Sequence, residues 1–252
     1  MTPVAKEVAI TLNGWGHMFS GDQPAALRWR QLGGLVFPNA RRLTVRFGEP
    51  EHVFTESVNV AICNADDFVA LIRTAMIPSL CRVAFTGPDS SHVSAVSKSP
   101  ALSGLVSGLS VGIKRVELPS CFLELYPPVS YDCFTDVTHL VCEDVGDSAE
   151  DIIYIVNCNA PALVDLRVHG LPSTFAHELV YDEVGDYFVY ECLKRLELGL
   201  VASEGPAKQF VAGAKPFPGL KSLELKGEYP VYQDVWYERL IREIPYVKYT
   251  RA

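Results

Sequence analysis

A six-residue pattern that recurs along the chain most strongly constrains what this sequence can fold into. The two clearest copies, Leu193–Leu198 and Leu220–Leu225, both read apolar-x-x-apolar-x-apolar. A segment this short cannot bury its apolar side chains alone, so the pattern predicts that each copy packs beside the next. The copies are Ala5–Ile10, Ala40–Val45, Leu80–Phe85, Ile113–Leu118, Val137–Cys142, Leu163–Val168, Leu193–Leu198, Leu220–Leu225 and Ile244–Tyr249.

The spacing of the copies predicts parallel strands. Successive copies are separated by 24 to 40 residues, which is enough for one strand and a helix or a looser return segment. Four copies follow a proline, as expected where a helix turns into a strand; these are Pro38, Pro78, Pro161 and Pro218. We therefore predict an α/β solenoid, with a curved parallel sheet on one side and helices and loops on the other. It would form a single array of eight or nine irregular repeats over residues 1–252.

Helical periodicity and capping residues place helices between several copies. Asn64 is a suitable N-cap for the segment that follows it, and Ser148 with Asp151 resembles a capping box. The segments predicted to be helical are Gln23–Gly33, Ala65–Met76, Ala101–Leu109, Ser148–Asn157 and Gln233–Glu243.

These motifs resemble the leucine-rich repeat family in its irregular, long-repeat intracellular form. Leu193–Leu198 and Leu220–Leu225 match the family's Leu-x-x-Leu-x-Leu core. The Phe-Pro lead-in at Phe37 and Phe217 is similar to the degenerate repeats of fungal F-box-type proteins. The resemblance implies recognition of a protein partner, as in the substrate-recognition part of a ubiquitin-ligase adaptor. The family's Asn or Cys after the core is missing, and the F-box itself has no counterpart. The chain starts almost directly on a strand, which predicts a fragment or a paralogue without that module.

Composition limits the classes of partner and the compartment. The formal charge of −8 argues against a nucleic acid and favours a basic partner. The seven cysteines form no Cys-x-x-Cys pair, and we expect them to be packed in the core. We see no secretory signal and no apolar run long enough to span a membrane. We therefore predict an intracellular protein, in the cytoplasm or the nucleus, without a membrane partner.

Two candidate sites of chemistry are weighed against simpler explanations. Ser110 lies in a Gly-x-Ser-x-Gly motif, but a nucleophile elbow needs a strand before the serine and a helix after it. Here the order is reversed, so we favour a helix-to-strand turn. A metal site at His139, Cys142 and Glu143 is disfavoured because alternation puts Cys142 on the opposite face of its strand. We predict no metal and no cofactor.

The side chains between the buried positions offer a recognition surface. Because strand side chains alternate, two rows should line the open face of the sheet. One row would hold Arg42, Arg82, Arg115, His139, Asp165, Arg195 and Ser222, and the other Thr44, Ala84, Glu117, Val141, Arg167, Glu197 and Glu224. The simpler interpretation is a set of cross-strand ion pairs, such as Arg167 with Glu197.

We predict a non-enzymatic scaffold that binds a protein partner through this face. The residues predicted to bind the partner are Arg42, Arg82, Arg115, His139, Asp165, Arg167, Arg195, Glu197 and Glu224. Two alternatives remain open at this point: a hydrolase that uses Ser110 or a Cys/His pair, and a self-associating structural array.

Overall fold

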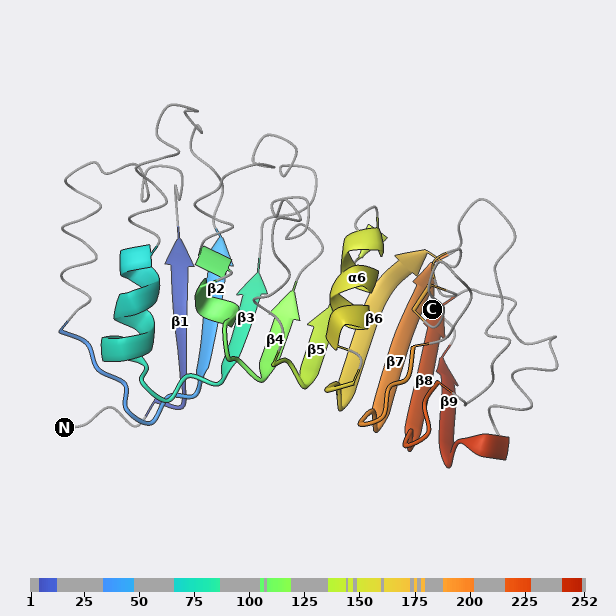
Figure 1. The fold of residues 1–252 in the computed structure, drawn as a ribbon. Coiled ribbons are helices and arrows are strands. Elements are labelled where there is room, and N and C mark those ends of the chain that lie inside the picture. The colour runs from blue at the N-terminus through green and yellow to red at the C-terminus, as the bar shows by residue number, and fades with distance from the viewer. Residues whose placement is uncertain are drawn as a thin grey trace. The chain divides into compact units, whose positions relative to one another are not determined.

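The chain divides into two compact units, Met1–Thr135 and Asp136–Ala252, each with its own set of parallel strands (Figure 1). The computed structural model describes residues 5–12, 34–47, 66–86, 105–106, 108–118, 136–143, 145–146, 149–159, 161–172, 175, 178–179, 188–201, 216–227 and 242–250. The predicted helices Gln23–Gly33 and Gln233–Glu243 lie outside the described residues, apart from the helical Arg242 and Glu243.

The described strands of the first unit pair in parallel and in chain order. They are β1 (Glu7–Leu12), β2 (Arg42–Phe47), β3 (Arg82–Thr86) and β4 (Arg115–Leu118). The fourth residues of the predicted copies stand opposite one another, Val8 beside Leu43, Leu43 beside Val83 and Val83 beside Val116. The prediction of parallel strands in this register is confirmed.

The second unit repeats this arrangement with five described strands. They are β5 (His139–Cys142), β6 (Asp165–Pro172), β7 (Arg195–Val201), β8 (Ser222–Gly227) and β9 (Tyr246–Thr250). All four neighbouring pairs are parallel, and Leu140, Leu166, Leu196, Leu223 and Val247 are in register. Strand β6 extends beyond the predicted Val168, and its pairing with β7 is irregular between Val168 and Leu171. Gly170 adopts a positive φ of 71° there, a conformation that glycine tolerates best.

The core of each unit lies between one face of its strands and the helices. In the first unit, Phe68, Ile72 and Met76 recur every four residues on the helix of residues 66–76 and are buried. The last six residues of that helix, Leu71–Met76, are wound as a π-helix. Of the predicted Ala101–Leu109 helix, residues 105–106 and 108–109 are described and helical, and the helix continues to residue 110. Arg73 joins the two helices by donating hydrogen bonds to the carbonyl oxygens of Gly108 (3.1 Å), Leu109 (3.3 Å) and Val111 (2.6 Å).

In the second unit, α6 (Ala149–Asn159) lies on one face of β5 and β6. Its residues Ile152, Ile155 and Val156 are buried, as are Leu140 and Leu166 on the strands. Fully burying a side chain of this size stabilises the fold by about 1.5–3 kcal/mol relative to leaving it exposed. The described part of each unit is therefore α/β, with an apolar strand face covered by helix.

Tight turns precede several of the strands. Backbone hydrogen bonds close such turns from Ala40 to Phe37 (3.1 Å), from Leu80 to Ile77 (3.1 Å) and from Leu220 to Phe217 (3.1 Å). Each of these turns has a proline as its second residue, where the fixed φ of proline fits. The prolines that the sequence places before the strands therefore shape turns.

The expectation that the cysteines are packed in the core is wrong for three of the four that the structure describes. Cys142 is buried, whereas Cys81, Cys158 and Cys192 are exposed. Cys158 follows Glu150 and Tyr154 at intervals of four residues on the outer stripe of α6, and all three are exposed. Cys81 and Cys192 lie just before their strands, where the chain passes through a turn at the surface.

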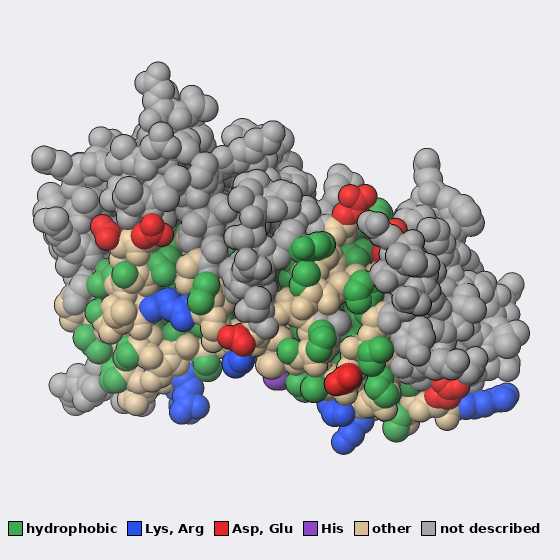
Figure 2. Space-filling model, viewed as in Figure 1, with side chains coloured by type: hydrophobic (Ala, Val, Ile, Leu, Met, Phe, Trp, Pro, Cys, Tyr) green, Lys and Arg blue, Asp and Glu red, His purple; other side chains and the backbone are tan. Residues whose placement is uncertain are grey.

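In Figure 2, which shows the side that carries the helices, hydrophobic side chains are interspersed with backbone and uncharged side chains. Exposed Lys and Arg side chains directly precede strands in each unit; these are Arg41 and Lys114 in the first unit and Lys194 and Lys221 in the second.

Candidate functional site: the polar face of the strands

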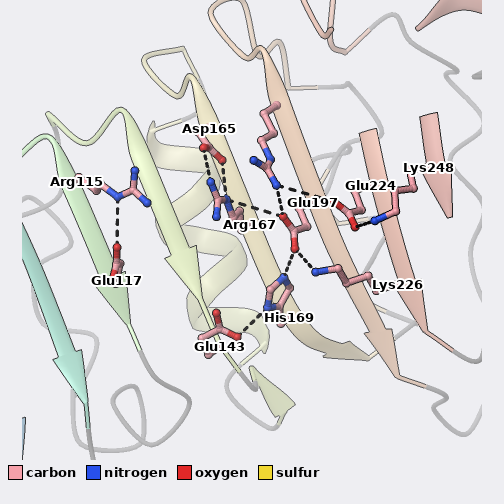
Figure 3. A network of polar contacts seen from close by, with 11 residues as sticks. Arg115, Glu117, Glu143, Asp165, Arg167, His169, Glu197, Glu224, Lys226 and Lys248 are labelled. Atoms are coloured by element: carbon pink, nitrogen blue, oxygen red, sulfur yellow. Dashed lines mark hydrogen bonds and ion pairs between the residues drawn. The ribbon is translucent and has the colours of Figure 1, made fainter. Parts of the chain in front are cut away.

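The strand face that points away from the helices carries charged side chains in both units; we call it the polar face. Figure 3 shows the charged side chains of the second unit on the opposite side of their strands from α6. Both predicted rows are in register within each unit. In the first unit Arg42 stands beside Arg82 and Arg82 beside Arg115, and in the second unit Asp165 stands beside Arg195. The second row continues from Val141 through Arg167 and Glu197 to Glu224.

In the first unit, one carboxylate is shared by three arginines. Arg42, Arg82 and Arg115, which we call the arginine row, all contact Glu117 from three successive strands. The Nη2 atom of Arg42 lies 3.1 Å from Oε2 of Glu117, and Nε of Arg115 lies 3.3 Å from Oε1. Arg82 also donates a hydrogen bond to Oε1. Because each guanidinium comes from a different strand, the carboxylate joins β2, β3 and β4 through their side chains.

Glu7 on β1 extends this cluster by one strand. Its Oε1 atom lies 3.3 Å from Nε of Arg42 and accepts a hydrogen bond of 2.9 Å from the Thr44 hydroxyl. The Glu7 side chain is half exposed, so this ion pair is accessible to solvent and contributes little to stability.

The electrostatics of Glu117 follow from its neighbours. Partial burial alone would raise the pKa of the Glu117 carboxyl group, because the charged form loses hydration. The hydrogen bond and positive charge of Arg82, with the charge of Arg42, outweigh that effect and hold its pKa below the ordinary value. Glu117 is therefore ionised at neutral pH, and the three arginines remain in excess over it.

In the second unit, Glu197 is the centre of a larger group of ion pairs, which we call the glutamate network. Glu197 is only 3% exposed. Its Oε1 atom accepts a hydrogen bond from Lys226 and lies 2.9 Å from Nε2 of His169, and its Oε2 atom lies 2.8 Å from Nη2 of Arg195. The predicted pair between Arg167 and Glu197 is present at 3.9 Å. A buried carboxylate is tolerated here because several donors converge on it.

The pKa of the Glu197 carboxyl group is lowered, because these donors more than compensate for its burial. Loss of hydration would raise the pKa, but hydrogen bonds from Lys226, His169 and Arg195 lower it to about 2. Glu197 therefore remains ionised throughout the physiological pH range.

Further carboxylates and cations surround Glu197 (Figure 3). Asp165 receives two hydrogen bonds from Arg167 on its own strand, at 3.1 and 2.9 Å. Glu224 lies 2.9 Å from Lys248 of β9 and 3.8 Å from Arg195. On the other side, Nδ1 of His169 lies 2.7 Å from Glu143. The network therefore links β5 to β9 by side-chain contacts on one face.

The structure brings together eight of the nine predicted site residues in two groups. Arg42, Arg82 and Arg115 form one group, and Asp165, Arg167, Arg195, Glu197 and Glu224 belong to the other. His139 stands beside Asp165 in register, but its described side-chain contact is with the hydroxyl of Thr138, at 2.9 Å.

Sequence reasoning missed several members of the polar face. These are Glu7, Glu143 as an ion-pair partner, His169, Lys226 and Lys248. The signal that could have found His169 and Lys226 is the same alternation of side chains, continued beyond the six-residue copies along β6 and β8.

Ser110 and Cys142, the two residues considered for chemistry, are both buried. Ser110 is fully buried, follows helical residues and precedes a turn into β4, so the order of elements is that of the predicted turn. The Cys142 thiol is buried, which raises its pKa well above the ordinary value and suppresses the nucleophilic thiolate. Within the described ranges, no group of three His, Cys, Asp or Glu side chains is arranged to hold a metal ion.

The described helices include none that is both long enough and apolar enough to cross a bilayer. No protein-family model matches this chain, and no curated protein matches it. The resemblance to leucine-rich repeats and to F-box-type proteins therefore stays a prediction that rests on the six-residue copies.

Proposed function

We propose that this protein is a non-enzymatic scaffold that binds a protein partner through the polar face of its parallel strands. The observation that carries the proposal is the register of the arginine row, which places three guanidinium groups side by side on neighbouring strands. These side chains are 28–31% exposed, so a partner can reach them.

The arrangement of the polar face suits recognition because its side chains are held in place before a partner arrives. Each arginine of the row is oriented by Glu117. Parallel strands fix the backbone on which the side chains stand. Ordering flexible side chains usually costs binding free energy, and a prearranged surface avoids part of that cost.

The resemblance adds a narrower proposal, that the partner is a substrate presented to a ubiquitin ligase. That proposal is supported by the six-residue copies and the Phe-Pro lead-ins alone. An intracellular location belongs to the same proposal.

The proposal can be tested by capturing partners from a native lysate on the purified chain. The test variant is Arg82→Gln with Arg115→Gln, which removes two charges of the row and keeps polar side chains. The control variant is Lys194→Gln with Lys221→Gln, which removes two exposed charges from the second unit. Thermal unfolding of both variants checks that each is folded.

Proteins that bind through the arginine row should be lost from the test variant and retained by the control. Each candidate is then purified and its affinity measured against both variants. If every captured protein binds the wild type and the test variant equally, the arginine row is not the binding surface.

A further inference from the structure

We propose that the arginine row is a docking site for an acidic peptide segment of the partner. This inference deepens the proposed function by naming the chemistry that the partner presents, and it rests on that function. Carboxylates and phosphate groups share this chemistry, since both are oxygen anions that guanidinium groups can hold with paired hydrogen bonds.

The described part of the polar face in the first unit carries an imbalance of charge. Its described charged side chains are Glu7, Arg42, Arg46, Arg82, Arg115 and Glu117, four cations against two carboxylates. The chain as a whole has a formal charge of −8, so this positive surface opposes the overall charge. Local complementarity, rather than net charge, decides which group docks at a surface.

The guanidinium groups of the arginine row have N–H donors that the described hydrogen bonds do not use. Each guanidinium presents several N–H groups in a planar fork. The described hydrogen bonds of the arginine row use four of these groups, two from Arg42 and one each from Arg82 and Arg115. Glu117 alone receives three of the four bonds. The three side chains are 28–31% exposed, and the Nε atoms of Arg42 and Arg82 are buried without a hydrogen-bond acceptor, so a second anion would meet donors that the described residues leave unused.

The arginine row also places like charges opposite one another on neighbouring strands. Arg42, Arg82 and Arg115 are direct register partners on neighbouring strands, and like charges in such positions destabilise a sheet. Glu117 offsets part of this repulsion. A bound anion would offset more of it, so the repulsion in the free protein favours binding.

The dimensions of the row favour a peptide over a small ion. Neighbouring strands are about 4.8 Å apart, so the three arginines span about 10 Å across the strands. Arg46 lies a further four residues along β2, about 13 Å from Arg42. An extended peptide advances about 3.4 Å per residue, so several acidic residues within a short segment could contact the row together. A nucleic acid would also bring the rest of its phosphate backbone against a chain with a net negative charge.

The test measures the binding of fluorescent probes to the full chain by anisotropy. The probes are a peptide of about twelve residues rich in Asp and Glu, the same peptide with two phosphoserines, and an Asn/Gln peptide of equal length. A single-stranded oligonucleotide of about twelve nucleotides is the fourth probe. We expect both acidic peptides to bind and the neutral peptide and the oligonucleotide to bind at least tenfold more weakly. Binding of the phosphorylated peptide alone would assign the site to phosphate.

Three variants separate a docking site from a structural cluster. Arg82→Gln should weaken binding of the acidic peptide by about tenfold, because a guanidinium contact is lost. Glu117→Gln should strengthen it by about three- to fivefold, because it removes a competing negative charge while the amide oxygen can still accept hydrogen bonds that orient the arginines. Arg46 has no ion pair among the described residues, so Arg46→Gln should fold normally and weaken binding about twofold. Lys221→Gln in the second unit is the charge-matched control and should leave the affinity unchanged.

The inference is overturned if the acidic and neutral peptides bind equally, or if the oligonucleotide binds as tightly as the acidic peptides. It is also overturned if Arg82→Gln and Arg46→Gln leave the affinity for the acidic peptide unchanged. Even if these results overturn the inference, the proposed function holds as long as a captured protein binds the wild type and not the Arg82→Gln, Arg115→Gln variant. Conversely, if the acidic peptide binds but no protein is captured from the lysate, the proposed scaffold function is contradicted and the docking site is not.

Discussion

The two units carry comparable charged side chains on their polar faces but use them differently. In the first unit, the arginine row and Arg46 outnumber Glu7 and Glu117. In the second unit, the four described carboxylates of the glutamate network are matched by four Arg and Lys side chains, and His169 joins two of the carboxylates. Among the residues that the structure describes, the first face is therefore left positive, whereas the charges of the second face neutralise one another.

The charge balance of each polar face differs from the net formal charge of the whole unit. Residues 1–135 contain eleven Lys and Arg and eleven Asp and Glu, so the first unit is formally neutral. Residues 136–252 contain eleven Lys and Arg and nineteen Asp and Glu, which accounts for the whole formal charge of −8. Cross-strand ion pairing therefore accounts for the described charges of the second face, whereas the excess of described cations on the first face is the basis of the proposed anion site.

The largest expected change in the free energy of unfolding comes from replacing Glu197, the centre of the glutamate network. Glu197→Gln should lower the free energy of unfolding by about 3 kcal/mol, because Arg195 and Lys226 would face an amide instead of a buried carboxylate. Urea unfolding measures this change. Glu224→Gln, at a more exposed carboxylate on the next strand, serves as the control and should cost less. If Glu197→Gln left stability unchanged, the network would not be what holds the second face together.

Acid should remove the same contribution from the wild-type protein. The pKa of Glu197 is lowered from an ordinary value of 4.5 to about 2 on folding. Its contribution is therefore fully present above about pH 4.5 and is lost as the pH falls toward 2, with a total on the order of 3 kcal/mol. Unfolding free energies measured between pH 6 and pH 3 should fall more steeply for the wild type than for Glu197→Gln. Parallel curves for the two proteins would contradict this assignment.

A smaller loss of stability is expected at Glu117, the corresponding carboxylate of the first unit. Glu117→Gln should cost about 1 kcal/mol of unfolding free energy, because Glu117 is more exposed than Glu197 and its arginines remain hydrated. The same urea titration measures it, with Glu7→Gln as a control at the half-exposed end of the cluster. A loss as large as that of Glu197→Gln would mean that the two faces are built alike, and the comparison would fail.

The strands and their register could be predicted because they depend on local information. Six of the nine copies have buried apolar side chains at their first, fourth and sixth positions, as at Leu163, Leu166 and Val168, and a shift of one residue would expose all of them. The turns before the strands are local too, since Pro38 and Pro218 need only their neighbours to fix the chain direction.

The ion pairs could be predicted only in part, because they depend on side-chain reach and on residues beyond the copies. Alternation places Arg167 beside Glu197, and that pair was found. His169 and Lys226 approach Glu197 from two residues further along β6 and β8, outside the six-residue frame. Burial of Glu197 itself depends on its neighbours in three dimensions, which no single strand specifies. Cys158 was misplaced for a related reason, since the exposed stripe of α6 depends on how that helix packs.

Lys248 on β9 provides the smallest expected effect and marks the outer limit of the glutamate network. Its ammonium group lies 2.9 Å from Glu224, but the side chain is half exposed, so water replaces the ion pair readily. Lys248→Gln should therefore leave the urea midpoint indistinguishable from that of the wild type. Lys226→Gln, which removes a hydrogen bond to the buried Glu197, should shift the midpoint clearly. Equal shifts for the two lysines would show that burial of the carboxylate does not set the strength of these pairs, and the contrast between Glu197 and Glu117 would lose its physical basis.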